Sequence, residues 1–259
     1  MGERRIREMF GAGRKVLIAY LLAGDPSLKA SCDAALYLSE AGADLIELGV
    51  PFSDPVADGP IIQKASQRAL AQATTLARIL EIIPGLKEKL GKPLILMSYF
   101  NPIYRYGLER FVVDLKSAGG DGLIACDLPF EESEEMRTLL QDEGLAYIPL
   151  VAPTTPDKRL KNIADHGSGF IYCISRTGVT GPREDLPSET EDYLRRVRQA
   201  TNLPLVVGFG VNRPEQAKKL SPLADGVVVG SAIVERLSRG EVPAAVGLVE
   251  SLRKSLDDA

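Results

Sequence analysis

Short apolar runs recur along the whole chain and alternate with amphipathic, helix-like segments. Each run is almost continuously apolar, which is typical of strands buried on both faces in a parallel sheet covered by helices. The eight runs span residues 16–23, 45–50, 93–100, 122–128, 147–152, 169–175, 204–211 and 226–230. Amphipathic stretches, which we expect to be helices, include residues 28–41, 61–73, 131–143 and 189–200.

Eight strand–helix units without a break in composition predict one α/β domain, a (β/α)₈ TIM barrel that spans residues 1–259. Extra helices are expected at the N-terminus, after the second strand at 75–90, and at the C-terminus over 242–256. An open doubly wound sheet is the alternative, but no Gly-x-Gly-x-x-Gly pattern opens a helix after the first run. In such a barrel the active site lies at the C-terminal ends of the strands.

Composition excludes several classes of function. The 259 residues include 45% hydrophobic and 25% charged residues, and the net charge of −4 argues against nucleic-acid binding. A single histidine, His166, argues against a histidine metal cluster or a Ser-His-Asp triad. Cys32, Cys126 and Cys173 have no metal-like spacing, and no signal-peptide core or membrane-length apolar run is present. We therefore expect reduced cysteines and a cytoplasmic location.

The most informative segment is the second apolar run, because it carries one carboxylate. Side chains alternate along a strand, so Glu47 should point away from the face shared by Ile46 and Leu48. A buried acid is costly unless it is paired or used. Asp58 follows on a loop rich in turn-forming residues, and two acids that converge on one pocket are what acid–base chemistry needs. The alternatives are structural: Glu47 satisfied by neighbouring groups, and Asp58 capping the next helix.

Other strand ends add candidates for a binding pocket. Asp127 lies near the end of the fourth run, and strand parity places it with Leu123 and Ala125. Tyr99 and Tyr172 end apolar runs, where they would line a pocket for an aromatic substrate or pack in the core.

The last quarter of the sequence predicts a phosphate site. Gly208-Phe209-Gly210 lies at the end of the seventh run, and Gly230-Ser231 lies at the end of the eighth, where Ser231 opens a short helix over 232–237. Glycine lets backbone N–H groups approach an anion, and barrels often hold phosphate between these two loops. A long polar loop, 175–187, follows the sixth run and is a candidate lid over the site.

These segments together resemble the alpha subunit of tryptophan synthase over nearly the whole chain. The signature-like stretch runs from Glu47 to Gln63 and reads ELGVPFSDPVADGPIIQ. Further matching pieces are Gly24-Asp25-Pro26, Met97-Ser98-Tyr99-Phe100-Asn101-Pro102, Asp127-Leu128-Pro129, Ser175-Arg176-Thr177-Gly178-Val179-Thr180-Gly181, Gly208-Phe209-Gly210 and Gly230-Ser231-Ala232. One departure is Tyr20, at a position where the family often has phenylalanine.

The resemblance implies a lyase that cleaves indole-3-glycerol phosphate to indole and glyceraldehyde 3-phosphate by a retro-aldol reaction, with no metal or cofactor in this chain. It implies that Glu47 is the general acid/base and that Asp58 hydrogen-bonds the indole N–H. The implied phosphate ligands are Gly181, Gly210, Gly230 and Ser231, and the implied substrate-binding residues are Tyr99, Asp127, Tyr172, Thr180 and Phe209.

The resemblance also implies a partner, a beta subunit that carries pyridoxal phosphate and receives indole within an α₂β₂ heterotetramer. Two alternatives stay open on the residues alone. One is a different phosphate-binding barrel, such as an isomerase of the same pathway or a prenyl-glyceryl phosphate transferase, which would lack the Glu47/Asp58 signature. The other is a regulatory subunit that only activates its partner, for which neither acid would be needed.

Overall fold

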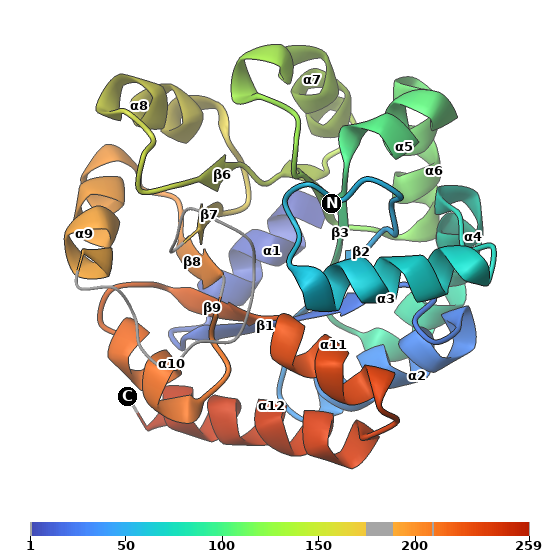
Figure 1. The fold of residues 1–259 in the computed structure, drawn as a ribbon. Coiled ribbons are helices and arrows are strands. Elements are labelled where there is room, and N and C mark those ends of the chain that lie inside the picture. Colours follow the sequence, from blue (N-terminus) through green and yellow to red (C-terminus); the bar gives the residue numbers. More distant parts are fainter. Residues whose placement is uncertain (1, 175–188, 209, 259) are drawn as a thin grey trace.

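The strands form one wholly parallel sheet that curls into a barrel. The computed structural model describes residues 2–174, 189–208 and 210–258. Its strands run in the spatial order β5-β4-β3-β2-β1-β9-β8-β7-β6 (Figure 1). Their bounds are β1 Val16–Leu22, β2 Leu45–Gly49, β3 Leu94–Ser98, β4 Gly122–Ala125, β5 Ala146–Tyr147, β6 Leu150–Val151, β7 Ile171–Ile174, β8 Leu205–Gly208 and β9 Gly226–Val229. The predicted TIM barrel is confirmed.

The fifth predicted strand is divided into β5 and β6, and this division closes the ring. The first piece pairs with β4 and the second with β7. Between them, the N–H of Ile148 donates to the Leu123 carbonyl at 2.9 Å, and the N–H of Tyr172 donates to the Pro149 carbonyl at 3.0 Å. The fourth strand is shorter than predicted and ends at Ala125, so Asp127 lies beyond it.

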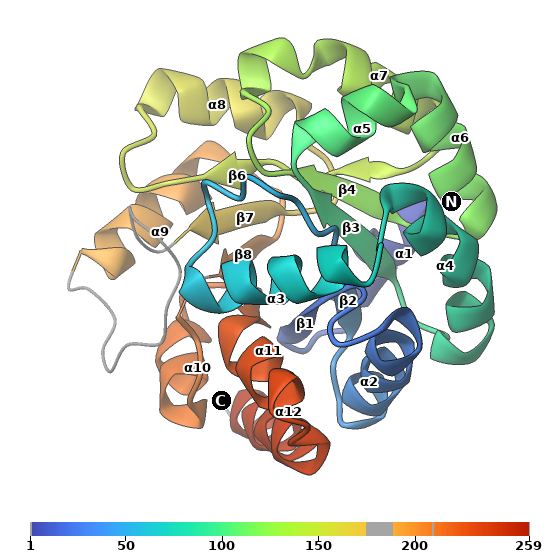
Figure 2. The same cartoon turned by 45° about the vertical axis from the view of Figure 1, so that its right-hand side comes forward.

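Helices surround the sheet, as the amphipathic segments predict (Figures 1 and 2). Their bounds are α1 Gly2–Phe10, α2 Leu28–Glu40, α3 Pro60–Ala71, α4 Leu76–Leu90, α5 Phe100–Tyr106, α6 Leu108–Ala118, α7 Glu134–Asp142, α8 Asp157–His166, α9 Thr190–Ala200, α10 Pro214–Leu220, α11 Ser231–Ser238 and α12 Val242–Asp257. No helix in the described ranges is both long and apolar enough to cross a membrane.

Local sequence signals explain several helix ends. Pro60 occupies the first turn of α3, where its missing N–H costs nothing. The Thr75 hydroxyl accepts a hydrogen bond from the N–H of Arg78 at the start of α4, which ends at Gly91 with a left-handed φ of 63°. The predicted helix over 131–143 is instead a 3₁₀ turn, Phe130–Glu132, followed by α7, because the Ser133 hydroxyl donates to the Phe130 carbonyl at 2.7 Å.

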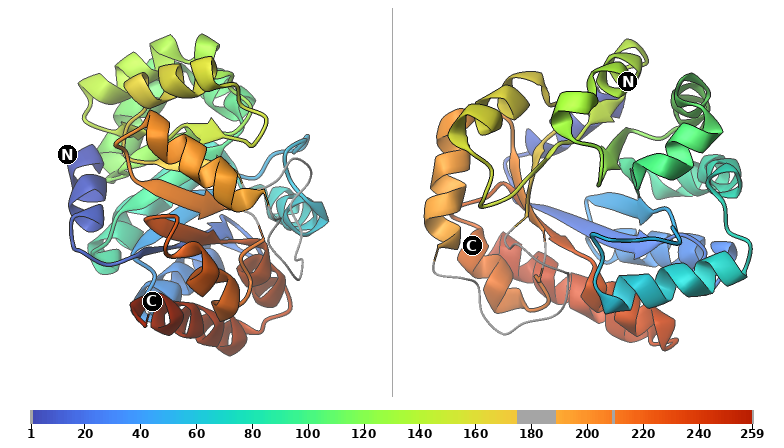
Figure 3. Two further views of the ribbon diagram at one scale, coloured as in Figure 1. Left: turned by 90° about the vertical axis from the view of Figure 1, so that its left-hand side faces the viewer. Right: turned by 45° about the horizontal axis from the view of Figure 1, so that its top comes forward.

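Strand parity separates two apolar layers. Ile46 and Leu48 pack outward against the helices, together with Leu17 and Leu123. The inward face forms a second cluster that fills the barrel and contains Ile18, Tyr20, Leu45, Ile95, Ile124, Tyr172, Val206 and Val228. The inner cluster also includes Ile6 of α1, so this helix covers one end of the barrel, whereas α3 lies at the opposite end (Figure 3, left).

The N-terminal end of the barrel carries a repeated polar clamp, made by the residue that directly precedes β2, β4 or β9, or the Gly169-Phe170 pair that leads into β7. Asp44 accepts a hydrogen bond from the N–H of Leu17 at 2.9 Å, and its own N–H donates to the Leu17 carbonyl at 2.7 Å. The same pair of bonds joins Asp121 to Leu94, Ser168 to Tyr147 and Asp225 to Leu205. Each clamp joins two neighbouring staves of the barrel, the divided strand β5 and β6 counting as one, at the end opposite to the predicted active site.

Candidate active site

Glu47 is the acid at the centre of the barrel mouth. It lies on β2 opposite Tyr20 of β1, points inward as parity predicts, and is fully buried. Within the described residues neither carboxylate oxygen has a hydrogen-bond partner. Burial, and secondarily the charge of Asp58, raises the pKa of Glu47 to about 8, so this carboxyl group keeps its proton at neutral pH.

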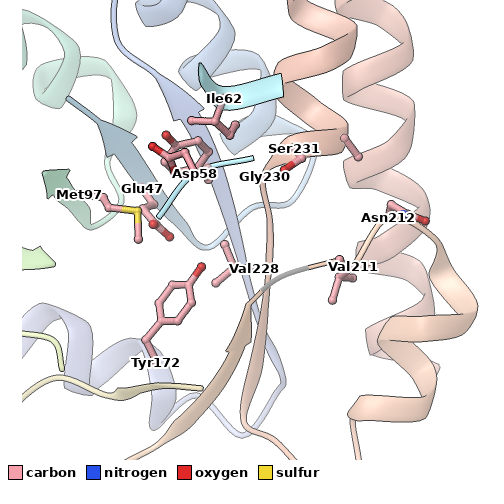
Figure 4. A pocket seen from close by; sticks show the side chains of 13 residues that line it. Glu47, Asp58, Ile62, Met97, Tyr172, Val211, Asn212, Val228, Gly230 and Ser231 are labelled. Atoms are coloured by element: carbon pink, nitrogen blue, oxygen red, sulfur yellow. The ribbon is translucent and has the colours of Figure 1, made fainter. Parts of the chain in front are cut away.

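Asp58 lies beside Glu47 on the loop between β2 and α3 (Figure 4). Burial raises the pKa of Asp58 to about 6, although a hydrogen bond from Tyr99 opposes the shift. The Tyr99 hydroxyl donates to Asp58 Oδ2 at 3.1 Å and accepts from the N–H of Ala57 at 3.0 Å. The Gln63 amide nitrogen donates to the Asp58 carbonyl at 2.9 Å. Asp58 is therefore a fixed, mainly ionised carboxylate next to a protonated one.

One pocket contains both acids and the predicted phosphate loops. Figure 4 shows Tyr172 directed toward Glu47, with Gly230 and Ser231 farther along the same cavity. Its described lining residues are Tyr20, Glu47, Asp58, Ile62, Met97, Tyr172, Gly210, Val211, Asn212, Val228, Gly230, Ser231 and Ala232. The acid end is thus enclosed by aromatic and apolar side chains, which suit a flat apolar ring.

The other end of the pocket suits an anion through its backbone. Gly230 precedes α11, whose first residue is Ser231, and Gly210 has a left-handed φ of 91°. The first N–H groups of a helix have no intrahelical partner, and the helix dipole gives this end of the helix a partial positive charge. None of the described lining residues is Lys or Arg. Backbone groups, the Ser231 hydroxyl and the Asn212 side-chain amide are therefore the donors that this end of the pocket offers to a phosphate.

Some predicted residues lie away from this cavity or outside the described residues. Tyr99 touches Asp58 and stacks on Phe52, with ring centroids 5.0 Å apart. Asp127 is exposed, accepts a hydrogen bond from the N–H of Phe100 at 2.6 Å, and is not among the described lining residues, so its contact with substrate stays a prediction. Thr180, Gly181 and Phe209, and with them the lid loop 175–187, lie outside the described residues.

Several lining residues were not predicted as site residues. Ile62 and Met97 line the acid end, and Asn212 lines the phosphate end. Tyr20 was noted only as a departure from the family, although it shares inward parity and register with Glu47. Register between neighbouring strands is the signal that would have found it, but the sequence alone does not give it.

Comparisons with known proteins concern the chain as a whole. The family model "Tryptophan synthase alpha chain" matches residues 7–255. The chain belongs to the tryptophan synthase alpha chain family. The alpha chain of Caldanaerobacter subterraneus subsp. tengcongensis is 47% identical over 238 residues, which cover 92% of this chain and 90% of that relative. The alpha chain of Carboxydothermus hydrogenoformans is 51% identical over 223 residues, covering 86% and 84%.

Solved structures of tryptophan synthase share the fold. A chain of the Mycobacterium tuberculosis enzyme superposes with a TM-score of 0.91 at 36% identity, covering 97% of this chain and 98% of that one. Subunit alpha from Legionella pneumophila str. Paris gives a TM-score of 0.90 at 34% identity, covering 100% and 98%. As a tryptophan synthase alpha chain, the protein is a lyase that cleaves indole-3-glycerol phosphate.

Proposed function

We propose that Glu47 is the general acid/base of this cleavage and that Asp58 stabilises the charge on the indole ring. The observation that carries the proposal is the pairing of a fully buried carboxyl group, which has no hydrogen-bond partner among the described residues, with a second, half-buried carboxylate in one cavity. Burial gives Glu47 the higher pKa of the two, so near neutral pH one group holds a proton and the other is ionised. This difference in pKa assigns Glu47 as the acid and Asp58 as the anion.

The only catalytic steps that the reaction then asks of the protein are proton transfers to and from the substrate. The Glu47 carboxyl protonates the indole carbon that bears the glycerol chain, and the positive charge on the ring nitrogen is stabilised by Asp58. The Glu47 carboxylate next takes the proton of the adjacent glycerol hydroxyl. The C–O bond becomes C=O, the carbon–carbon bond breaks, and its electron pair restores the aromatic indole. Glu47 ends protonated, so we propose that this chain needs no metal or cofactor of its own.

The rest of the pocket is proposed to bind and orient the substrate. Gly210, Gly230 and Ser231 are proposed to hold the phosphate, with Gly181 as a further ligand. Tyr172 and Phe209 are proposed to enclose the indole side. Tyr99, Asp127 and Thr180 complete the proposed set, and the hydrogen bond from Tyr99 to Asp58 supports a role in holding that carboxylate.

The direct test measures indole release from indole-3-glycerol phosphate by wild type, Glu47→Gln and Asp58→Asn. Both substitutions keep the side-chain shape, and each is expected to lower the rate by about 100-fold or more, because each removes a group that acts in the transition state. Glu109→Gln, on the exposed side of α6, is the matched control and should leave the rate unchanged. Release that survives in Glu47→Gln would refute its role as the acid.

We further propose that the protein works in the cytoplasm with a beta subunit that carries pyridoxal phosphate and receives the indole, in an α₂β₂ complex. Exposed apolar side chains beside the pocket mouth support a partner surface there. Val56, on the loop that bears Asp58, is 78% exposed, and Tyr104 of α5 is 66% exposed. Val56→Asp should weaken partner binding and partner-induced activation, whereas Val113→Asp, 51% exposed on α6, should not. Equal effects of the two substitutions would contradict this surface.

A further inference from the structure

Tyr20 occupies the position between the two ends of the pocket. Its strand, β1, pairs with β2 on one side and with β9 on the other. Tyr20 lies opposite Glu47, and on the other side Ala19 pairs with Val229, directly before Gly230. A ligand with its ring beside Glu47 and its phosphate at Gly230 must therefore cross β1 at Tyr20.

The Tyr20 ring packs against two glycines, which leave room for it because they have no side chain. A Cβ atom on Gly230 would lie 3.2 Å from Tyr20 Cδ1, and one on Gly49 would lie 2.4 Å from the Tyr20 hydroxyl oxygen. The base of the ring is thus at the phosphate end, and the hydroxyl is at the acid end next to β2. The hydroxyl is consequently near the carbon atoms of a ligand that adjoin the ring, rather than near the phosphate.

The hydroxyl is a neutral donor in this place. Burial, followed by the charges of Asp58 and Glu47, raises the pKa of Tyr20 well above its ordinary value. None of the side-chain hydrogen bonds found among the described residues uses this hydroxyl, although Tyr20 lines the pocket. It is therefore available to a ligand.

We propose that the Tyr20 hydroxyl donates a hydrogen bond to the glycerol oxygen that becomes the aldehyde oxygen of the product. The inference rests on the proposed function of Glu47 and adds a catalytic residue to it. When the Glu47 carboxylate removes the proton from this oxygen, the oxygen gains negative charge until the carbon–carbon bond breaks and C=O forms. A fixed donor at that oxygen stabilises the transition state more than the bound substrate. The Tyr20 hydroxyl keeps its proton throughout, so the proton transfers and bond changes are those of the proposed cleavage.

The test combines a variant that lacks the Tyr20 hydroxyl with a ligand that lacks the glycerol hydroxyl. Tyr20→Phe is compared with wild type for kcat and KM on indole-3-glycerol phosphate. The two proteins are also compared for the Kd of 3-(indol-3-yl)propyl phosphate, which has the ring and the phosphate but no glycerol hydroxyl. We expect kcat to fall by about 10- to 100-fold, with KM and the analogue's Kd changed by less than about twofold. Tyr37→Phe, half-exposed on α2, is the matched control.

Two results would overturn the inference. The first is a kcat within about threefold of wild type, because the hydroxyl would then make no contact in the transition state. The second is a loss of analogue affinity as large as the loss of kcat, because the ring packing would then have changed. Glu47→Gln, measured in parallel, separates this proposal from the proposed function. Its inactivity together with a fully active Tyr20→Phe would refute the Tyr20 contact alone.

Discussion

Replacing Glu47 by glutamine should stabilise the fold by an amount that grows with pH. The ordinary pKa of this carboxyl group is 4.5, and burial raises it to about 8 in the folded protein. Between these values the folded protein keeps a proton that the unfolded chain releases. Unfolding therefore releases a proton and becomes more favourable as pH rises, so the free energy of unfolding contributed by Glu47 falls over this window.

The size of the effect follows from the shift. The difference of 8 − 4.5 = 3.5 pKa units corresponds to about 5 kcal/mol at 1.36 kcal/mol per unit, reached well above pH 8. Integrating the proton release between pH 5 and pH 9 gives about 4 kcal/mol. Glutamine has nearly the same shape and no charge, so Glu47→Gln should lose this pH dependence while it loses activity. Burial of Glu47 thus lowers the stability of the fold, and in return the site holds an acid that is protonated at neutral pH.

Urea unfolding at a series of pH values from 5 to 9 measures this contribution. The difference in unfolding free energy between Glu47→Gln and wild type should widen by about 4 kcal/mol in favour of the variant. Contributions from Asp58 and other groups are present in both proteins and largely cancel. Glu109→Gln, the same change of residue type at an exposed position, is the control. A constant difference for Glu47→Gln would refute the reasoning that burial holds the proton.

Three further predictions concern the site and the barrel. The rate of cleavage should rise with pH through about 6, as Asp58 ionises, and fall above about 8, as Glu47 loses its proton, in a pH–rate profile. Asp121→Ala removes the buried carboxylate that pairs with Lys87 and accepts from the N–H of Leu94, and should cost about 3 to 5 kcal/mol in urea unfolding, whereas the exposed Asp142→Ala should cost less than about 0.5. Gly208→Ala places a Cβ atom 2.3 Å from the Tyr172 ring and should lower turnover, whereas Gly247→Ala, in open space on α12, should stabilise α12 by up to about 1 kcal/mol in thermal unfolding. A fully active Gly208→Ala, or an Asp121→Ala as stable as its control, would contradict the contacts described here.

The strands could be predicted from the sequence because each is a short, continuous apolar run between amphipathic segments. Parity then predicted that Glu47 turns away from Ile46 and Leu48, and the structure confirms this. The division of the fifth strand could not be predicted, because it depends on which neighbours the two halves of one apolar run meet when the barrel closes.

The site was only partly predictable for a related reason. Glu47 and Asp58 carry a signal of their own, since an acid in an apolar run is unusual. Tyr20 carries none, because an inward tyrosine on a strand is most often core, and only its register with Glu47 brings it to the pocket. Asp127 was first a candidate as an acid on the fourth apolar run, and the resemblance then implied substrate binding, although parity grouped it with the outward-facing Leu123 and Ala125. Its side chain is exposed in the structure.

The order of the strands has a consequence for how the chain assembles. Neighbouring strands are successive along the chain, except that β1 pairs with β9, which joins Val16 to Gly226, a separation of 226 − 16 = 210 residues. Local pairs lose little loop entropy when they form, whereas this last pairing closes the longest loop of any strand pair in the described residues. Arg253 of α12 lies at the start of β1, where it donates hydrogen bonds to the Lys15 carbonyl at 2.9 Å and to Asp44 at 3.0 Å. One arginine far from the chemistry thereby ties the C-terminal helix to the start of the strand whose long-range pairing with β9 completes the ring around the cavity.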